Sequence, residues 1–142
     1  MPEALPPGSY LGFDFGLKYI GVAVGQTISG TANPLCVINI KSGIDWSKIS
    51  ALVNEWSPKG LIVGLPLTAD GKKTPLLKAI EKFTRELDMR YQLPIHHIDE
   101  RLSSFAARDL LNESTPGKMG RLDNAAAAII LQTWFHQYDD KH

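Results

Sequence analysis

Four acidic residues, far apart in the sequence, stand where apolar segments begin or end. Asp14 lies among strand-forming apolar residues, Asp99 and Glu100 follow a short apolar segment, and Asp123 precedes an alanine-rich one. Carboxylates gathered in one place repel each other strongly unless a cation compensates them. Oxygen ligands prefer hard ions, so these residues indicate Mg²⁺ or Mn²⁺. Two such ions can hold a phosphodiester and activate a water molecule for its hydrolysis.

Each acid also has a purely structural interpretation. Asp14 stands close to Gly16, and an aspartate in a turn often bonds its own backbone. Asp123 could complement the dipole of a helix. Asp99 and Glu100 are adjacent, so in a strand they point to opposite faces and at most one is expected to bind a metal directly. We favour Glu100, because its longer side chain reaches further toward the first strand.

Basic residues near these acids fit a nucleic-acid backbone. Those nearest to the acids in the predicted fold are Lys18, Lys72, Lys73, Arg101, Lys118 and Arg121. Each one alone is more often a solvated surface charge. The net charge of zero, from 15 basic and 15 acidic residues, does not favour nucleic-acid binding. The local distribution of charge matters more than the total, and these residues are expected to surround the acids.

Length and composition limit the class of protein. A chain of 142 residues suffices for a single domain over 1–142, and residues 1–9, with three prolines, are expected to form a loose lead-in. Cys36 is the only cysteine, which suits a reducing compartment. No apolar segment approaches the roughly 20 residues of a membrane span, and the N-terminus lacks a signal-peptide pattern. We therefore expect a cytoplasmic protein.

The hydrophobic pattern predicts an α/β fold in the order βββαβαβαα. The predicted strands are 10–15, 20–26, 31–40, 61–63 and 94–98, and the predicted helices are 45–56, 75–91, 103–112 and 122–138. Three strands on short turns form an antiparallel meander, with Pro34 typical of an edge strand. The helices that follow predict parallel strands joined by right-handed crossovers. A mixed five-stranded sheet with helices on both faces follows, which is the topology of ribonuclease H.

This topology would bring the acids together. Sites on open sheets form beyond the carboxyl ends of parallel strands. Asp14 lies near the end of the first predicted strand, Asp99 and Glu100 lie at the end of the fifth, and Asp123 lies in the first turn of the last helix. We expect all of them at one edge of the sheet.

Four stretches of the chain resemble the signature stretches of the YqgF/RuvX family, in the family's order: FDFGLKYIGVAVGQTISGTANPL, LIVGLPLTADG, HHIDERLSS and GRLDNAAAAIIL. The resemblance covers residues 10–135. It implies a ribonuclease H-like fold and a metal-dependent nuclease, named for pre-16S rRNA processing and earlier described as a Holliday junction resolvase. The family's acids map onto Asp14, the pair Asp99 and Glu100, and Asp123. Better-known resolvases carry an acid on the fourth strand, where this chain has the apolar 61–63.

The main hypothesis is an endonuclease that acts on structured nucleic acid. It would process the 5′ end of the 16S rRNA precursor in ribosome biogenesis, with a Holliday junction in DNA as the alternative substrate. The proposed partners are precursor rRNA or branched DNA and a ribosomal particle, and the protein could act as a monomer or a homodimer. The residues expected to act in catalysis are Asp14, Glu100 and Asp123, with Asp99 added to the metal-binding set. The residues expected to bind nucleic acid are Lys18, Arg101, Lys118 and Arg121.

Two hypotheses of other classes remain. The segment DFGLKYIGVAVG also resembles the first phosphate loop of the actin, Hsp70 and sugar-kinase superfamily, which would imply ATP binding. Those proteins hold the nucleotide between two such domains, whereas this sequence has one and lacks a second phosphate loop. A non-catalytic module that binds nucleic acid is the other hypothesis. It is favoured by the zero net charge and by the missing acid on the fourth strand.

Overall fold

The computed structural model describes residues 6–66, 71–100 and 119–141, with the side chains of 125–138 in the last range. The strands are β1 (Ser9–Phe15), β2 (Tyr19–Gln26), β3 (Thr31–Asn39), β4 (Gly60–Leu65) and β5 (Ile95–Asp99), and the helices are α1 (Trp46–Trp56), α2 (Pro75–Tyr91) and α4 (Met119–Lys141). The predicted helix at 103–112 lies outside the described residues.

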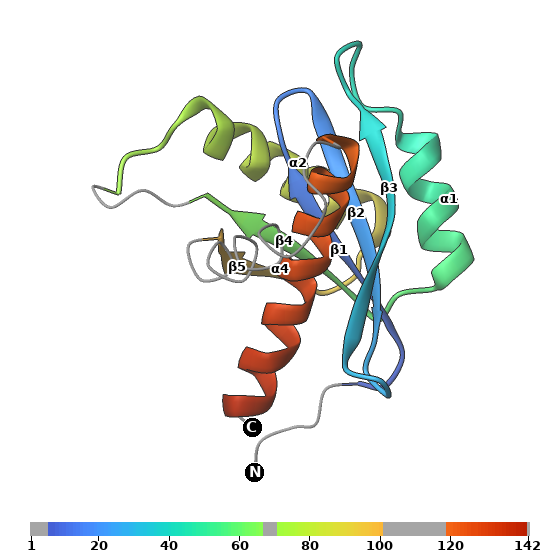
Figure 1. Cartoon of the computed structure of the whole chain (residues 1–142). Coiled ribbons are helices and arrows are strands. Elements are labelled where there is room, and N and C mark those ends of the chain that lie inside the picture. The colour runs from blue at the N-terminus through green and yellow to red at the C-terminus, as the bar shows by residue number, and fades with distance from the viewer. Residues whose placement is uncertain (1–5, 67–70, 101–118, 142) are drawn as a thin grey trace.

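The five strands form one mixed sheet in the order β3-β2-β1-β4-β5. The first three strands pair antiparallel, and β4 pairs parallel with both β1 and β5. This confirms the predicted fold class, and β3, which contains Pro34, lies at an edge. The chain leaves β3, passes through α1 and enters the sheet beside β1, so β1 has a neighbour on each side (Figure 1).

Each face of the sheet carries its own apolar core. Leu11, Phe13 and Phe15 of β1 pack on one face, in a cluster that also contains residues of α1 and α2. Tyr10 points the other way and packs against Trp134 and other residues of α4. Figure 1 shows α4 lying along the sheet, with α1 beyond the strands. The apolar segment 61–63 is buried on both sides, as such a strand requires.

Helix α4 packs closely on β1 because Gly12 has no side chain. A Cβ atom at Gly12 would lie 2.9 Å from Leu131 Cβ and 3.2 Å from the carbonyl oxygen of Ala127. Both distances are too short for an ordinary contact, so a larger residue at position 12 would push the helix away. Tyr10, Gly12 and Asp14 alternate along the strand onto the same face. This close approach of α4 to β1 therefore lies two residues from Asp14, on the same face of the strand.

Two predicted boundaries are wrong. The lead-in is attached from Pro6 onward, because the Pro6 carbonyl accepts from the Tyr10 hydroxyl (2.7 Å) and the Gly8 amide donates to Thr27 Oγ1 (3.0 Å). The last helix begins at Met119 and has no acidic residue in its first turn. Asp123 therefore lies one turn deeper than predicted. Its interpretation as a partner of the helix dipole loses its basis, since that effect is confined to the first turn.

Candidate active site

The carboxyl ends of β1, β4 and β5 meet at one edge of the sheet, because these three strands run parallel. Asp14 is the last residue but one of β1, Asp99 is the last residue of β5, and Glu100 follows it directly. The structure therefore brings three of the four predicted acids to the same edge.

Asp14 faces α4. Its neighbours in β1, Phe13 and Phe15, both belong to the core beneath α1 and α2. Because side chains alternate along a strand, Asp14 points to the opposite face. That face is the one on which α4 packs.

The two acids at the end of β5, Asp99 and Glu100, lie on opposite sides of the sheet. The His97 ring and the Thr84 hydroxyl of α2 are 3.1 Å apart and share a hydrogen bond, whereas Ile98 packs in the α4 core. Continued alternation places Asp99 on the α2 side and returns Glu100 to the α4 side. Glu100, which the sequence favours over Asp99 as a direct metal ligand, thus lies on the same side of the sheet as Asp14.

Glu100 reaches Asp14 across β4. Its carboxyl group shares a hydrogen bond with that of Asp14. The Glu100 side chain passes over Gly64 of β4. A Cβ atom at Gly64 would be only 2.7 Å from Glu100 Oε1 and 2.7 Å from Ile130 Cδ1. The fourth strand thus supplies no acid, but it supplies the space through which an acid on the fifth strand reaches the first.

The Glu100 carboxyl is strongly perturbed. Its pKa is raised from 4.5 to about 8, first by burial, then by the hydrogen bond with Asp14, and then by the negative charges of Asp14 and Asp99. The two carboxyl groups therefore share a proton at neutral pH when no cation is present. A divalent ion would supply the positive charge that this pair needs, so the pair fits the predicted metal chemistry.

The described residues contain no larger cluster of metal ligands. Within 6–66, 71–100 and 125–138, no group of three or more His, Cys, Asp and Glu residues is arranged so that it could hold a metal ion. The side chain of Asp123 is not among the described ones, although its backbone lies in α4. His96 packs against Trp134, with ring centres 4.9 Å apart, so a structural role suits it.

A pocket of about 380 Å³ opens beside Asp14. Its walls are formed by Asp14, Gly16, Leu17, Lys18, Tyr19 and Leu76. Lys18 thus lines the same pocket as Asp14. Leu17 and Tyr19, which the sequence reasoning missed, are 64% and 36% exposed although both are apolar. Their signal in the sequence is an apolar residue on each side of a lysine in a tight turn.

Of the other predicted basic residues, Lys72 and Lys73 lie in the segment between β4 and α2. Lys73 pairs with Glu81 of α2, at 3.0 Å between Nζ and Oε2. Arg101 and Lys118 lie outside the described residues, as does the side chain of Arg121.

Among the helices in the described ranges, none has the length and the apolar character that a membrane span needs.

Solved structures with this fold include Holliday junction resolvases. Thermus thermophilus RuvC in complex with a Holliday junction superposes with a TM-score of 0.59 at 11% identity, covering 94% of this chain and 95% of that one. The yeast mitochondrial resolvase Ydc2 gives 0.61 at 11% identity, over 96% and 81% of the two chains. At this identity the likeness shows the fold, which is the ribonuclease H-like fold predicted from the sequence.

The particular family is shown by sequence. Residues 8–137 match the model of the RuvX family, described as Holliday junction resolvase. A Legionella pneumophila protein (strain Philadelphia 1) is 44% identical over 94% of this chain and 99% of its own length. A Nitrosococcus oceani protein is 46% identical over 94% and 90%. Both carry the name "Putative pre-16S rRNA nuclease". This chain belongs to the RuvX family, and the predicted membership is confirmed.

Proposed function

We propose that this protein is a divalent-metal-dependent endonuclease that cleaves precursor rRNA. The observation that carries the proposal is the Asp14–Glu100 pair, which is half-buried, joined by a hydrogen bond and located at the edge where parallel strands end. The names of the relatives support the RNA substrate. We further propose that the protein acts in the cytoplasm on a ribosomal particle, as a monomer or a homodimer.

Asp14 and Glu100 would hold the ion once Glu100 has released its proton. When bound, Mg²⁺ or Mn²⁺ supplies the charge that orients a scissile phosphate and activates the attacking water. Asp99, on the other side of the strand end, acts on Glu100 through its charge. We therefore assign Asp99 a tuning role and Glu100 the role of ligand.

Asp123 is the third proposed ligand. Phe135 of α4 packs against Tyr10 of β1, with ring centres 5.9 Å apart. Further along β1, Ala127 and Leu131 of α4 lie over Gly12. The helix therefore runs antiparallel to the strand. One further turn toward its N-terminus advances about 6 Å, and two further residues of β1 advance about 7 Å. This progression supports a position of Asp123 close to Asp14.

The pocket beside Asp14 would receive the nucleotide next to the scissile bond. Lys18 offers a charge for a phosphate, while Leu17 and Tyr19 offer exposed apolar surface for a sugar or an unpaired base. Arg101, Lys118 and Arg121 complete the proposed contacts with flanking phosphates.

A Holliday junction in DNA is the second candidate substrate. It is favoured by the description of the family model and by the fold shared with RuvC and Ydc2. Both substrates would be cleaved at the same proposed active site, so one set of variants tests both candidates.

The test compares Asp14→Asn with Asp88→Asn, a matched change at an exposed acid of α2. Each protein is incubated in Mg²⁺ with a precursor rRNA fragment, a four-way DNA junction and a linear duplex. We expect the wild type and Asp88→Asn to cleave the RNA, and Asp14→Asn to cleave it at least about a hundredfold more slowly. Asp14-dependent cleavage of the junction alone would favour the second candidate. Cleavage by Asp14→Asn at the wild-type rate would refute the proposal.

A further inference from the structure

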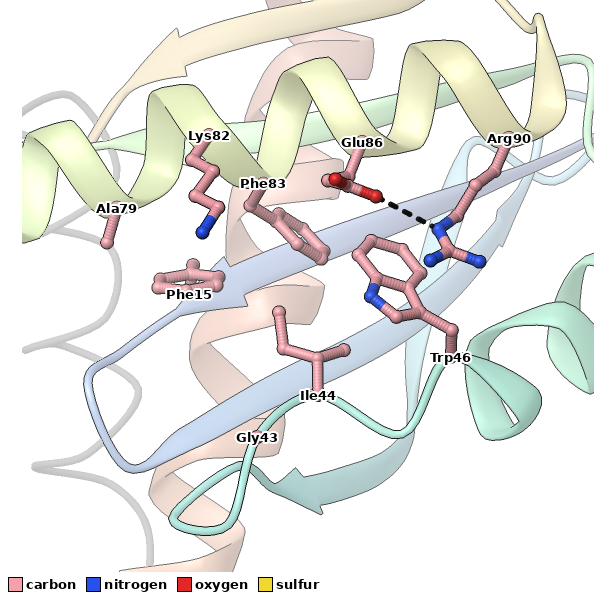
Figure 2. Close-up of a pocket in the computed structure, with 9 residues that line it drawn as sticks. All are labelled: Phe15, Gly43, Ile44, Trp46, Ala79, Lys82, Phe83, Glu86 and Arg90. Atoms are coloured by element: carbon pink, nitrogen blue, oxygen red, sulfur yellow. Dashed lines mark hydrogen bonds and ion pairs between the residues drawn. The ribbon is translucent and has the colours of Figure 1, made fainter.

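A second pocket, of about 390 Å³, lies between α2 and the loop that precedes α1 (Figure 2). It is lined by Phe15, Gly43, Ile44, Trp46, Ala79, Lys82, Phe83, Glu86 and Arg90. Phe15 directly follows Asp14 but points to the other face of the sheet. The pocket therefore lies on the opposite side of the strand end from the carboxyl pair.

The two pockets are neighbours along α2. Leu76 lines the pocket beside Asp14, and Ala79 lines the second one. Three residues of an α-helix advance about 4.5 Å, which is less than the length of one nucleotide in an extended strand. The second pocket begins near the end of β1, at Phe15 and Ala79, and extends along α2 as far as Arg90. A nucleic-acid strand that passes Asp14 would therefore come within about one nucleotide of the near end of the second pocket.

The walls of the second pocket are flat and apolar. Phe83 lies between two aromatic neighbours, Phe15 at 5.0 Å and Trp46 at 5.6 Å between ring centres. Ile44 closes the side opposite α2 (Figure 2). Figure 2 also shows the indole nitrogen of Trp46 on the side of the ring that faces the pocket, away from Arg90. Such walls suit a planar group that carries hydrogen-bond acceptors.

The rim of the second pocket is positively charged. Glu86 accepts a hydrogen bond from Arg90 Nε at 3.1 Å, and the Arg90 guanidinium lies over the Trp46 ring, 4.3 Å from its centre. The negative charge of Glu86 is thus balanced by the positive charge of Arg90, and Lys82 adds a second positive charge. In Figure 2 the Lys82 amine extends over the pocket toward Phe15. The surplus of positive charge favours an anionic ligand, and the apolar walls favour a planar one.

We propose that this pocket binds one unpaired nucleotide of the substrate strand, with its base against the apolar walls and its phosphate at Lys82. The proposal rests on the proposed nuclease function for the identity of the strand. It assigns the pocket a part in substrate selection, because only a strand with an unpaired nucleotide close to the cleaved bond can fill it. A fully paired duplex would leave it empty.

The test reads binding directly and needs no cleavage. The chain has three tryptophans, so a ¹⁵N-labelled sample gives three indole signals, and Trp46→Phe identifies that of Trp46. Metal-free Asp14→Asn is titrated with a single-stranded RNA oligonucleotide, a blunt RNA duplex, a nucleoside monophosphate and inorganic phosphate. We expect the oligonucleotide to shift the Trp46 signal and to leave that of the buried Trp134 unchanged. The duplex and inorganic phosphate should shift neither.

Two variants and a control locate the effect. Ala79→Leu fills the pocket, and Lys82→Ala removes its surplus charge from an exposed position. Lys78→Ala removes the same charge from α2 at an exposed residue that lines neither pocket. We expect Ala79→Leu and Lys82→Ala each to weaken oligonucleotide binding roughly tenfold, and Lys78→Ala to change it less than twofold. Thermal melts check that Ala79→Leu is folded, and Lys82→Ala decides the result if it is not.

Several results would overturn the proposal. A Trp46 signal that stays fixed at saturating oligonucleotide would do so, as would equal losses in Lys82→Ala and Lys78→Ala. A monophosphate that binds as tightly as the oligonucleotide would make this a site for free nucleotides, which also contradicts it. Failure of the nuclease proposal has a different signature, namely cleavage that does not depend on Asp14 while the Trp46 shift persists.

Discussion

Replacing Glu100 with glutamine removes the ionisable group from the carboxyl pair and keeps a side chain of nearly the same shape. In the metal-free wild type, the pKa of Glu100 is about 8 in the folded protein against an ordinary value of 4.5. Between these values the folded protein holds a proton that the unfolded chain has already released. The free energy of unfolding of the wild type therefore falls as the pH rises through this window, and the loss is complete above about pH 8. Glutamine does not titrate, so Glu100→Gln escapes this loss.

The size of the effect follows from the shift in pKa. Each pH unit within the window is worth 1.36 kcal/mol, so the change from 4.5 to about 8 corresponds to about 5 kcal/mol in total. Between pH 6 and pH 9 the corresponding loss is about 3 kcal/mol, and partial exposure of Glu100 to solvent reduces it to roughly 1–2 kcal/mol. For a chain of this length that equals roughly 3–6 °C in melting temperature.

The assay is a series of thermal melts, followed by circular dichroism, at several pH values in EDTA. The quantity of interest is the melting temperature of Glu100→Gln minus that of the wild type. We expect this difference to grow by roughly 3–6 °C from pH 6 to pH 9. Glu81→Gln, at a more exposed acid of α2, should show no such growth. A difference that stays constant across this range would refute the coupling of Glu100 to Asp14.

Three further results are expected. Binding of Mn²⁺ should release a proton below pH 8 and tighten as the pH rises, because Glu100 must first deprotonate. Calorimetry in buffers of different ionisation enthalpy measures the affinity and the number of protons released. Binding without proton release would contradict this expectation. Gly64→Ala should displace Glu100, since the added Cβ would lie 2.7 Å from its Oε1. We expect roughly tenfold weaker Mn²⁺ binding by the same method. An unchanged affinity would argue against Glu100 as a metal ligand. Tyr19→Ala should weaken binding of a single-stranded substrate roughly tenfold, whereas Ile28→Ala, at a more exposed apolar residue in the next turn, should not. Equal effects in a fluorescence-anisotropy titration would argue against a base contact.

The order of the elements could be predicted from the sequence because their signals are local. The apolar stripe of α2, with Pro75 in its first turn, predicts its observed bounds of Pro75–Tyr91. The start of α4 could not be predicted in this way. Gly120 has a low helix propensity, yet the helix includes it and begins one residue earlier, at Met119.

The candidate site depends on contacts between segments that are distant in the sequence. Some features of the site could be predicted from the sequence, whereas those that depend on these contacts could not. Alternation along β5 separates Asp99 from Glu100, which a sequence pattern can indicate. The passage of Glu100 over Gly64 requires the register of β4 against β5, which no local pattern contains. The pocket of Figure 2 likewise combines β1, a loop and α2. Its aromatic residues look like ordinary core residues in the sequence.

Anomalous diffraction at the manganese edge, from crystals soaked in MnCl₂ near pH 8.5, tests the central claim most directly. We predict a peak within about 2.5 Å of carboxylate oxygens from both Asp14 and Glu100, with Asp123 completing the site. A saturated crystal without a peak at this pair, or with manganese bound only elsewhere, would contradict the assignment of these acids as a metal-binding active site.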